Sequence, residues 1–267
     1  MTGTALASDV ASADLAPFRR IVVAVDETVE SQEAARQAAV LRAPGGDLHL
    51  LATVNAAAAA HAGFAAPGLV DQMLLGARAA LDRAVAATGP TTERLARGRP
   101  TSRLLDAVRR HDATLVVVGC REHRRAAGLL VGDVGSVVLR EAPCSVLVAR
   151  PDTWPDGRPE RIVVGIDGSP ESDRAARVGA SVASRFGARL TLVVGLGGKL
   201  RDPRAVVERN PGAVVDQRPP VDALVAASRS ADLLVVGSRG LHGLHALGSV
   251  SERVAHRAHA SVLVVRG

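Results

Sequence analysis

The sequence predicts an α/β protein built from two doubly wound parallel-sheet (Rossmann-like) domains in tandem, the second of them shortened. Two observations lead to this fold class. Short runs of β-branched and other apolar residues alternate with longer helix-like segments along the chain, and such alternation is typical of a parallel sheet covered by helices on both faces. In addition, the same order of segments occurs twice, so the second half of the chain repeats the first.

The repeat is visible in three segments that return in the same order. They are "IVVAVDETVES" (21–31) with "IVVGIDGSPES" (162–172), "ATLVVVG" (113–119) with "ADLLVVG" (231–237), and "SVLVAR" (145–150) with "SVLVVR" (261–266). Six of eleven positions are identical in the first pair. The offset falls from 141 to 118 to 116 residues, so the second copy lacks 23 residues between its first two segments and 2 more after them. This pattern indicates a duplication.

The repeat also divides the chain. We expect a flexible N-terminal tail over 1–17, a first domain over 18–150, a linker over 151–160 and a second domain over 161–267. The linker reads "PDTWPDGRPE" and contains three prolines and a glycine, which mark irregular structure. Trp154 within it is expected to dock on the surface of a domain.

Each copy opens with a strand, a helix and a second strand. "RIVVAV" and "RIVVGI" are continuous β-branched runs, as expected for strands that are covered on both faces. The helices that follow, "ESQEAARQAAVLRA" and "ESDRAARVGASVASRFG", have acidic residues in their first turns, where the helix dipole favours them. "DLHLLATV" and "ARLTLVVGL" are then predicted as the second strands.

The middle of the two copies differs in length. Copy one continues with an alanine-rich loop (56–67) and the helix "GLVDQMLLGARAALDRAVAATG", which shrinks in copy two to about "DPRAVVERN". Short third strands are predicted at "TERLARG" and "AVVDQRP", followed by helices at "PTSRLLDAVRRHDA" and "PVDALVAASRSA" that have proline near the first turn. Two more strands, with a glycine-containing loop and a last helix between them, complete each copy.

Composition and charge argue against several classes of function. The net charge of +6 is spread over both halves, and the chain has no Tyr, one Trp and three Phe, so we expect no nucleic-acid partner. The N-terminus has no basic segment followed by an apolar one, and no apolar run approaches about 18 residues. We therefore expect a cytoplasmic protein without a membrane partner. Cys120 and Cys144 are expected at opposite ends of neighbouring strands, and hence as reduced thiols.

A ligand site is predicted where the strand order reverses, beyond the carboxyl ends of the strands. In copy two this places Asp167, after the first strand, beside "GSRGLHGLHALGSVS" (237–251), after the fourth. Backbone N–H groups of such a glycine loop can bind phosphate, and Ser249 and Ser251 stand at the start of the last helix, whose N-terminus favours an anion. An Asp can also simply cap a helix and a Gly simply make a turn, but both features meet at one point of the fold.

The stretches "IVVGIDGSPESDRAARVGA", "ADLLVVGSRG" and "LGSVSERVAHRAHASVLVV" resemble the universal stress protein family. The resemblance covers nearly the whole chain twice and implies a tandem member. In nucleotide-binding members, the loop runs Gly, two residues, Gly, nine residues, then Gly-Ser or Gly-Thr, and an Asp at the end of the first strand contacts the nucleoside. The resemblance implies ATP or another adenine nucleotide as the ligand, with Mg²⁺ only as a companion of the nucleotide. The implied nucleotide-binding residues are Asp167, Gly237, Gly240, Gly248, Ser249 and Ser251.

The loop of copy two departs from the family pattern. Only seven residues separate Gly240 from Gly248, and the two missing residues remove up to about 7 Å of extended chain. Gly195 also stands on the second strand where the family usually has a larger apolar residue against the base. The loop is therefore expected to hold a triphosphate less well.

Copy one departs differently. Asp26 is in place and the loop spacing is intact, but Glu122 replaces the second glycine and Asp133 the terminal serine. Two carboxylates repel a polyanion, so copy one is not expected to bind ATP in the manner of the family.

No metal site or catalytic group is predicted. His242 with His245 and His256 with His259 form two His-x-x-His spacings, but a helix about 12 Å long separates the pairs. No arrangement of Ser, His and Asp or of Cys and His indicates an activated nucleophile. The chain is therefore predicted not to be an enzyme, with weak ATP hydrolysis as an open alternative.

Two functions from different classes remain. The first is a stress-response regulator with a weakened adenine-nucleotide site in the second domain. The second is an interaction module that binds no nucleotide and whose two copies form an intramolecular pseudo-dimer. Dimers of the family form through the last strands, so the resemblance implies that residues 145–150 and 261–266 pair the two domains within one chain about a pseudo-twofold axis. Unpaired edge strands of this kind are also sticky. A further homodimer and an unidentified downstream protein partner stay open.

Overall fold

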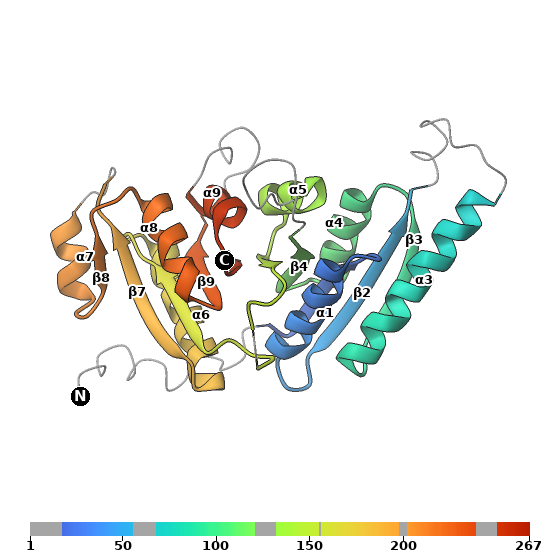
Figure 1. Ribbon diagram of the computed structural model, residues 1–267, viewed down its shortest axis with the longest axis horizontal. Coiled ribbons are helices and arrows are strands. Elements are labelled where there is room, and N and C mark those ends of the chain that lie inside the picture. The colour runs from blue at the N-terminus through green and yellow to red at the C-terminus, as the bar shows by residue number, and fades with distance from the viewer. Residues whose placement is uncertain (1–17, 56–67, 121–131, 155, 198–201, 239–249) are drawn as a thin grey trace. The chain divides into compact units, whose positions relative to one another are not determined.

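The computed structural model describes residues 18–55, 68–120, 132–154, 156–197, 202–238 and 250–267. The chain divides into two compact units, residues 18–151, here domain 1, and residues 152–267, here domain 2 (Figure 1). Each unit contains a parallel sheet in which strands and helices alternate along the chain. The predicted α/β fold class with a tandem arrangement is thereby confirmed.

In domain 1 the strand order is β3-β2-β1-β4-β5, so the order reverses between β1 and β4. Because right-handed crossovers on the two sides of this reversal cover opposite faces, α1 packs against α3 and α4 packs against α5. The strands are β1 (Arg20–Val25), β2 (Asp47–Val54), β3 (Thr92–Arg97), β4 (Leu115–Gly119) and β5 (Ser145–Ala149). The helices are α1 (Val29–Leu41), α3 (Leu69–Thr88), α4 (Pro100–Arg110) and α5 (Asp133–Glu141).

Domain 2 repeats this order as β8-β7-β6-β9-β10, with the reversal between β6 and β9. The strands are β6 (Arg161–Gly165), β7 (Arg189–Gly195), β8 (Val214–Asp216), β9 (Leu233–Gly237) and β10 (Ser261–Val265). The helices are α6 (Pro170–Phe186), α7 (Pro203–Arg209), α8 (Pro220–Ala227) and α9 (Val250–Arg257). The segment predicted as one helix at "PVDALVAASRSA" ends instead in a 3₁₀ turn, Ser228–Ser230.

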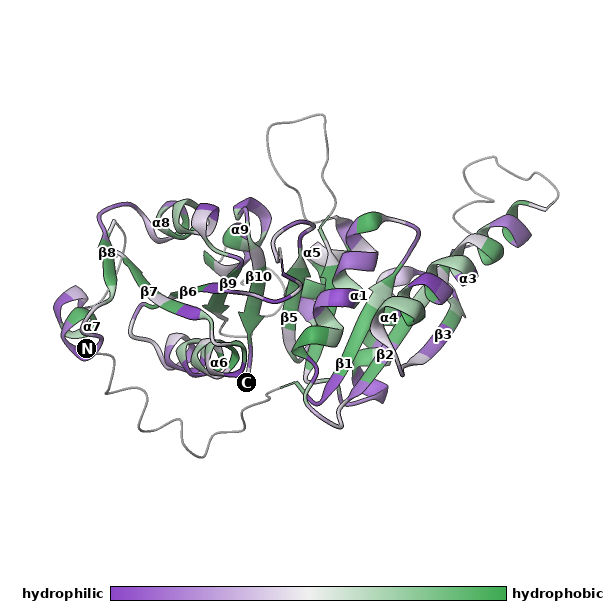
Figure 2. Ribbon diagram, turned by 60° about the horizontal axis from the view of Figure 1, so that its bottom comes forward, coloured by the Kyte–Doolittle hydropathy of each residue, from purple (hydrophilic) through white to green (hydrophobic). Residues whose placement is uncertain are grey.

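The central strands are apolar because both faces of each sheet are covered. Ile21, Val22 and Val23 of β1 are completely buried, as are Leu233 and Leu234 of β9. Figure 2 shows these strands as the most hydrophobic ribbons, whereas the helices carry both apolar and polar residues. Because these strands are packed on both faces, the ends of β1 and β4, and those of β6 and β9, are held in fixed positions.

The segment that precedes β6 is tied to domain 2 by a buried carboxylate. Asp232 is 1% exposed and accepts hydrogen bonds from the backbone N–H groups of Glu160 and Arg161, both at 2.8 Å. Arg161 Nη2 lies 2.6 Å from Asp232 Oδ1, and this hydrogen bond raises the pKa of Arg161. Trp154 Nε1 donates to the Asp232 carbonyl at 3.1 Å. Trp154 is 3% exposed, so the prediction that it docks on a domain is confirmed.

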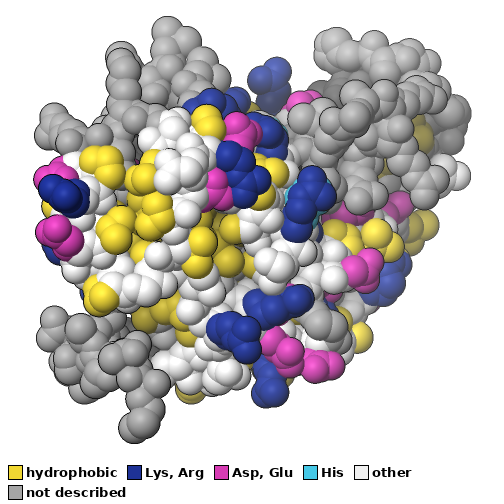
Figure 3. Space-filling view, turned by 60° about the vertical axis from the view of Figure 1, so that its left-hand side comes forward, with side chains coloured by type: hydrophobic (Ala, Val, Ile, Leu, Met, Phe, Trp, Pro, Cys, Tyr) yellow, Lys and Arg dark blue, Asp and Glu magenta, His cyan; other side chains and the backbone are white. Residues whose placement is uncertain are grey.

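The strand β8 is short and leaves apolar surface at the edge of domain 2. Val214 and Val215 are 52% and 39% exposed. Figure 3 looks from this side of domain 2 and shows apolar side chains gathered on the face, with charged side chains around them. In domain 1 the edge strand β3 instead carries Glu93, Arg94 and Arg97, which discourage the pairing of a further strand.

Candidate functional site

The candidate site of domain 2 begins at the loop between β6 and α6. Asp167 is exposed, and its Oδ1 accepts hydrogen bonds from the backbone N–H and the hydroxyl of Ser169, at 3.0 and 2.5 Å. The Ser169 side chain in turn accepts from the N–H of Ser172 at 3.2 Å and so caps α6. Asp167 Oδ2 has no hydrogen-bond partner among the residues that the structure describes. One oxygen of this carboxylate thus supports the helix cap, and the other is available to a ligand donor.

The equivalent loop of domain 1 makes the same hydrogen bonds around its aspartate, although only domain 2 has a positive φ at the next residue, Gly168. Asp26 Oδ1 accepts from the backbone N–H of Thr28 at 2.9 Å and from its hydroxyl, and the Thr28 side chain accepts from Ser31 N–H and caps α1. This loop has additional links, because Gln32 Nε2 donates both to the Asp26 carbonyl at 3.1 Å and to the Ala80 carbonyl at 3.2 Å. The second tie joins the start of α1 to α3.

The first glycine of each predicted phosphate loop has a structural reason of its own. A Cβ at Gly237 would lie 2.4 Å from the Glu171 carbonyl oxygen, and a Cβ at Gly119 would lie 2.6 Å from that of Glu30. These contacts bring the end of β9 or β4 directly against the first turn of the helix that follows β6 or β1. Sequence reasoning missed this role, although the presence of glycine at both equivalent positions was a visible signal.

The remaining residues of the predicted loop divide into two groups. Gly240, Gly248 and Ser249 lie outside the described residues, as do Glu122, His242 and His245. Ser251 lies in the first turn of α9 and is 7% exposed. In domain 1 Asp133 is exposed and is the first residue of α5, where the helix dipole favours a carboxylate. The assignment of phosphate contacts to this loop stays a prediction.

The short helix α7 covers the Asp167 loop from the side of β7. Gly168 has φ +78, a conformation that favours glycine, and a Cβ there would lie 2.7 Å from Val206 Cγ2 and 2.8 Å from Arg209 Nη2. Arg209 Nη2 lies 3.5 Å from the Gly168 carbonyl oxygen, and its Nε lies 3.3 Å from the Ala205 carbonyl oxygen. The exposed side chain of Arg209 therefore lies against Gly168, the residue that follows Asp167, and sequence reasoning did not find this neighbour.

Two glycines, Gly195 at the end of β7 and Gly197 just after it, lie close to the start of α8. A Cβ at Gly195 would lie 2.6 Å from Pro220 Cα, and one at Gly197 would lie 2.6 Å from Pro219 N. The backbone at the start of α8 therefore packs where the side chain of residue 195 would be. This packing is the physical reason for glycine at a position where the resemblance implied a larger apolar residue.

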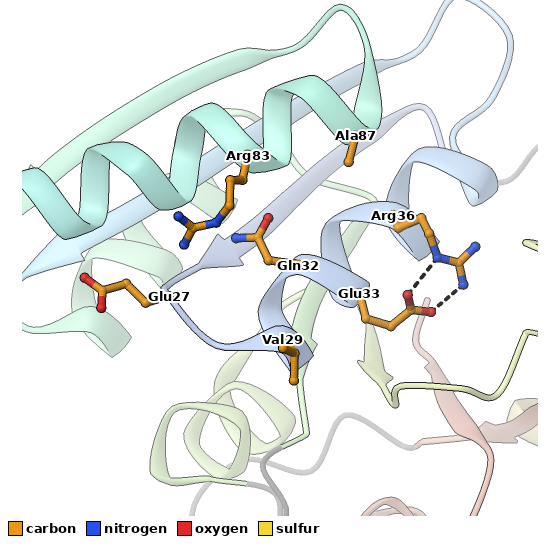
Figure 4. Close-up of a pocket in the computed structure, with 7 residues that line it drawn as sticks. All are labelled: Glu27, Val29, Gln32, Glu33, Arg36, Arg83 and Ala87. Carbon is orange, nitrogen blue, oxygen red and sulfur yellow. Dashed lines mark hydrogen bonds and ion pairs between the residues drawn. The ribbon is translucent and has the colours of Figure 1, made fainter.

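Domain 1 has an anion where domain 2 has Gly168. The corresponding residue is Glu27, and a Cβ at Gly76 in α3 would lie 1.6 Å from Glu27 Oε1. The Glu27 carboxylate thus lies against the backbone of α3 at Gly76, where there is no side chain. It also lines a surface hollow of about 590 Å³ between α1 and α3. Figure 4 shows Arg83 and Gln32 reaching into this hollow, with the Glu33–Arg36 ion pair at its other end.

Other reactive groups lie apart from these loops or are enclosed. Cys120 and Cys144 are both buried and form no disulfide with each other, in agreement with the predicted reduced thiols. The imidazole rings of His49 and His111 stack at 3.8 Å between centroids. Burial, and then the charge of His111, lower the pKa of His49, against a smaller opposing effect of Asp47. Within the described ranges, three or more metal-binding side chains do not come together anywhere. No helix in those ranges is long and apolar enough to span a membrane.

Comparison with known proteins identifies the relatives of the chain. The universal stress protein family profile (Usp) matches residues 17–150, 159–196 and 199–266. Universal stress protein Rv2005c of Mycobacterium tuberculosis is 36% identical, with 58% of this chain and 63% of that protein covered. Universal stress protein Rv2623 of the same species is 31% identical, with 58% and 62% covered. The chain therefore matches a little over three fifths of the length of these relatives.

Solved structures agree at the level of the fold. A universal stress protein from Archaeoglobus fulgidus has a TM-score of 0.70 at 21% identity, with 93% of this chain and 98% of that chain covered. A universal stress protein in complex with cAMP is 27% identical over 50% of this chain and 98% of that chain, with a TM-score of 0.37. The second likeness is too low to support an argument about the ligand of this chain.

Proposed function

This chain belongs to the universal stress protein family and carries Usp domains in tandem, and on that premise we propose that domain 2 binds an adenine nucleotide whereas domain 1 does not. The nucleotide lies beyond the carboxyl ends of β6 and β9, where the strand order reverses. Its presence sets the state in which the protein meets a downstream partner in a stress response. The protein acts through binding and not through catalysis.

The observation that carries the proposal is the state of Asp167. Its carboxylate is exposed, is held in position by two hydrogen bonds to Oδ1, and keeps Oδ2 for a donor on the ligand, such as a ribose hydroxyl or an adenine amine. The helices α6 and α9 begin after the carboxyl ends of β6 and β9, and the N-termini of helices favour a bound anion. The residues present in domain 2 therefore suit a nucleotide.

Domain 1 suits a nucleotide less well. Glu27 stands where domain 2 has Gly168, and Asp133 opens the helix α5. Asp133 raises the energy of a bound phosphate chain, and Glu27 places a second carboxylate on the side of the Asp26 loop that faces α3. The Asp26 loop is also tied to α3 through Gln32, which holds α3 over the loop.

Two measurements test the proposal. The nucleotide released from freshly purified and immediately denatured protein is identified by chromatography, and the melting temperature is recorded with ATP, ADP and AMP. At a ligand concentration one hundred times Kd, binding stabilises the fold by about 2.7 kcal/mol, which raises the melting temperature by roughly 5–10 °C. We expect such a rise for at least one nucleotide.

The variants Asp167→Ala and Asp26→Ala form a matched pair. Each loses the equivalent hydrogen bonds that support a helix cap, and each is expected to lower the melting temperature of the free protein by a similar amount. The nucleotide-dependent rise disappears only in Asp167→Ala. If millimolar ATP, ADP and AMP leave the melting temperature of the native chain unchanged, and no nucleotide is released, the proposal is wrong.

That negative result would favour the second candidate, an interaction module that binds no nucleotide. The observation in its favour is the sequence between Gly240 and Gly248, which is two residues shorter than the family pattern. For either function we propose that the domains pair through residues 145–150 and 261–266, as the repeat suggests. Cysteine pairs introduced along these segments are expected to crosslink within one chain under oxidation, and their failure to do so in any register would count against this pairing.

A further inference from the structure

We propose that Arg209 stacks its guanidinium on the base of the nucleotide in domain 2 and thereby supplies the stacking contact that neither Trp154 nor Phe186 provides there. The inference rests on the proposed function and adds a residue that determines how the base is recognised. It starts from the position of α7, which is reduced to Pro203–Arg209 and ends beside the Asp167 loop.

The topology determines which end of the nucleotide Arg209 faces. β6 lies between β9 and β7 in the sheet. The predicted phosphate loop follows β9, and Asp167 follows β6. The helix α7 follows β7, so Arg209 lies on the side of Asp167 away from the phosphate loop. A nucleotide whose phosphates lie at the β9 loop and whose nucleoside reaches Asp167 therefore presents its base toward α7.

Among the residues of domain 2 that the structure describes, no Trp, Phe or Tyr side chain lies at this edge of the sheet. Its residues include one Trp and one Phe and no Tyr. Trp154 is bonded to the carbonyl of Asp232, the residue before β9, and Phe186 is the last residue of α6. Both therefore lie toward the amino ends of the strands, opposite the candidate site. Gly195 at the end of β7 has no side chain to offer, and the start of α8 packs against it.

Arg209 has the properties that stacking requires. It is exposed, while its Nε and Nη2 are held at 3.3 and 3.5 Å from backbone carbonyl oxygens of Ala205 and Gly168. These contacts use edges of the guanidinium and leave its flat face for a base. Guanidinium planes stack on bases in the same way as aromatic rings. The glycine at 168 makes the close approach of α7 feasible, because a Cβ there would lie 2.8 Å from Arg209 Nη2.

The test compares three variants by calorimetric titration with ATP, ADP and AMP. Arg209→Gln removes the charge and the extended plane, and Arg209→Lys keeps the charge but removes the plane. Arg204→Gln is the matched control, since Arg204 is exposed at the other end of α7. We expect both Arg209 variants to weaken all three nucleotides by a similar factor, about fivefold or more, and Arg204→Gln to leave affinity unchanged.

Inorganic tripolyphosphate, which has no base, separates stacking from charge. The affinity for tripolyphosphate is measured by its competition with ATP. We expect this affinity to be the same in Arg209→Gln as in the native chain. If Arg209→Lys binds nucleotides as well as the native chain, or if tripolyphosphate binding falls in parallel with ATP binding, Arg209 acts as a charge and the inference is wrong. The inference also fails if nucleotides bind the native chain and Arg209→Gln equally well. If the native chain binds no nucleotide at all, the proposed function itself is wrong.

Discussion

A methyl group added at Gly237 or Gly119 tests whether these glycines are required by packing or by a ligand. The added Cβ would lie 2.4 and 2.5 Å from the oxygen and carbon of the Glu171 carbonyl in domain 2, and 2.6 Å from both atoms of the Glu30 carbonyl in domain 1. Ordinary contacts begin near 3.4 Å, so the first turn of α6 or α1 has to move by about 1 Å. A helix turn cannot rotate away as a flexible side chain can.

The expected cost is that of overpacking a close contact, about 1–3 kcal/mol for each alanine variant. Neither glycine has a positive φ, so backbone strain adds nothing, and alanine restricts the unfolded chain in a way that offsets a few tenths of this cost. Melting temperature falls by about 4 °C for each kcal/mol in domains of this size. We therefore expect losses of about 4–12 °C in the absence of any nucleotide.

The assay uses two signals. Trp154 is the single tryptophan of the chain and lies in domain 2, so its fluorescence follows the unfolding of domain 2 directly, while far-ultraviolet circular dichroism follows both domains. Gly237→Ala is expected to lower the fluorescence midpoint. Gly119→Ala is expected to lower the dichroism midpoint.

Gly132→Ala is the control, because a Cβ there meets no atom within 4 Å, and its cost as a helix-cap change is expected to stay below about 1 kcal/mol. Nucleotide-free melting curves that match the native chain would refute the packing argument. A Gly237→Ala chain that melts normally but gains nothing from nucleotide would assign this glycine to the ligand instead.

Further predictions concern charged groups outside the site. Asp232→Asn removes an oxygen charge that binds two backbone N–H groups and Arg161, and is expected to cost about 2–4 kcal/mol, measured by urea unfolding. Burial and the neighbouring His111 lower the pKa of His49 in the folded protein, so the unfolded chain takes up the proton first as the pH falls. We therefore expect the free energy of unfolding to decrease below about pH 6.5. Denaturant unfolding at about pH 5.5 and 7.5 is expected to show a smaller difference in this free energy for His49→Gln than for the native chain. A salt bridge to Arg218 lowers the pKa of Asp216 to about 2, and Arg218→Gln is expected to return it toward about 3.9, as followed by carboxyl-carbon NMR.

Much of the fold follows from local patterns in the sequence. The β-branched runs that became β1 and β6 are buried on both faces, and a strand in that position needs no information beyond its own residues. Trp154 was placed correctly for a similar reason, since a large apolar side chain in a polar linker has to be covered. The internal repeat then predicted correctly that both domains have the same sequence of strands and helices along the chain.

The part of the site that sequence reasoning missed depends on contacts between distant segments. The contact of Arg209 with Gly168 joins residues that are 41 positions apart, and it arises because α7 is short enough to end over the loop. The close approach of Gly237 to Glu171 likewise depends on how β9 and α6 meet in space. Periodicity and motif spacing do not encode such distances. The sequence therefore indicated that Gly237 matters for a phosphate site, but not that it is also required for packing against Glu171.

Comparison of the two copies separates residues that the fold requires from residues that report on a ligand. Asp26 and Asp167 make equivalent hydrogen bonds that support the caps of α1 and α6, so the presence of Asp in domain 1 is explained without any ligand. Gly119 and Gly237 are likewise both explained by packing. The shared hydrogen bonds by themselves therefore carry little information about binding. What distinguishes Asp167 is its setting, because it is exposed, whereas Asp26 is half-buried in a loop that is tied to α3.

The positions at which the two copies differ are more informative about ligand binding. Glu27 and Gly168 occupy equivalent positions, and the helix over each loop is α3 in domain 1 and the much shorter α7 in domain 2. In domain 1 a carboxylate fills the space against that helix, whereas in domain 2 the same space admits Arg209. A chimera tests this reasoning: Gly168→Glu is expected to displace Arg209 and abolish the nucleotide response of domain 2, and Gly168→Ala is the control for the backbone strain that any side chain meets at φ +78. A nucleotide response that survives in Gly168→Glu would mean that the difference between the copies resides elsewhere, in the loop that follows β9.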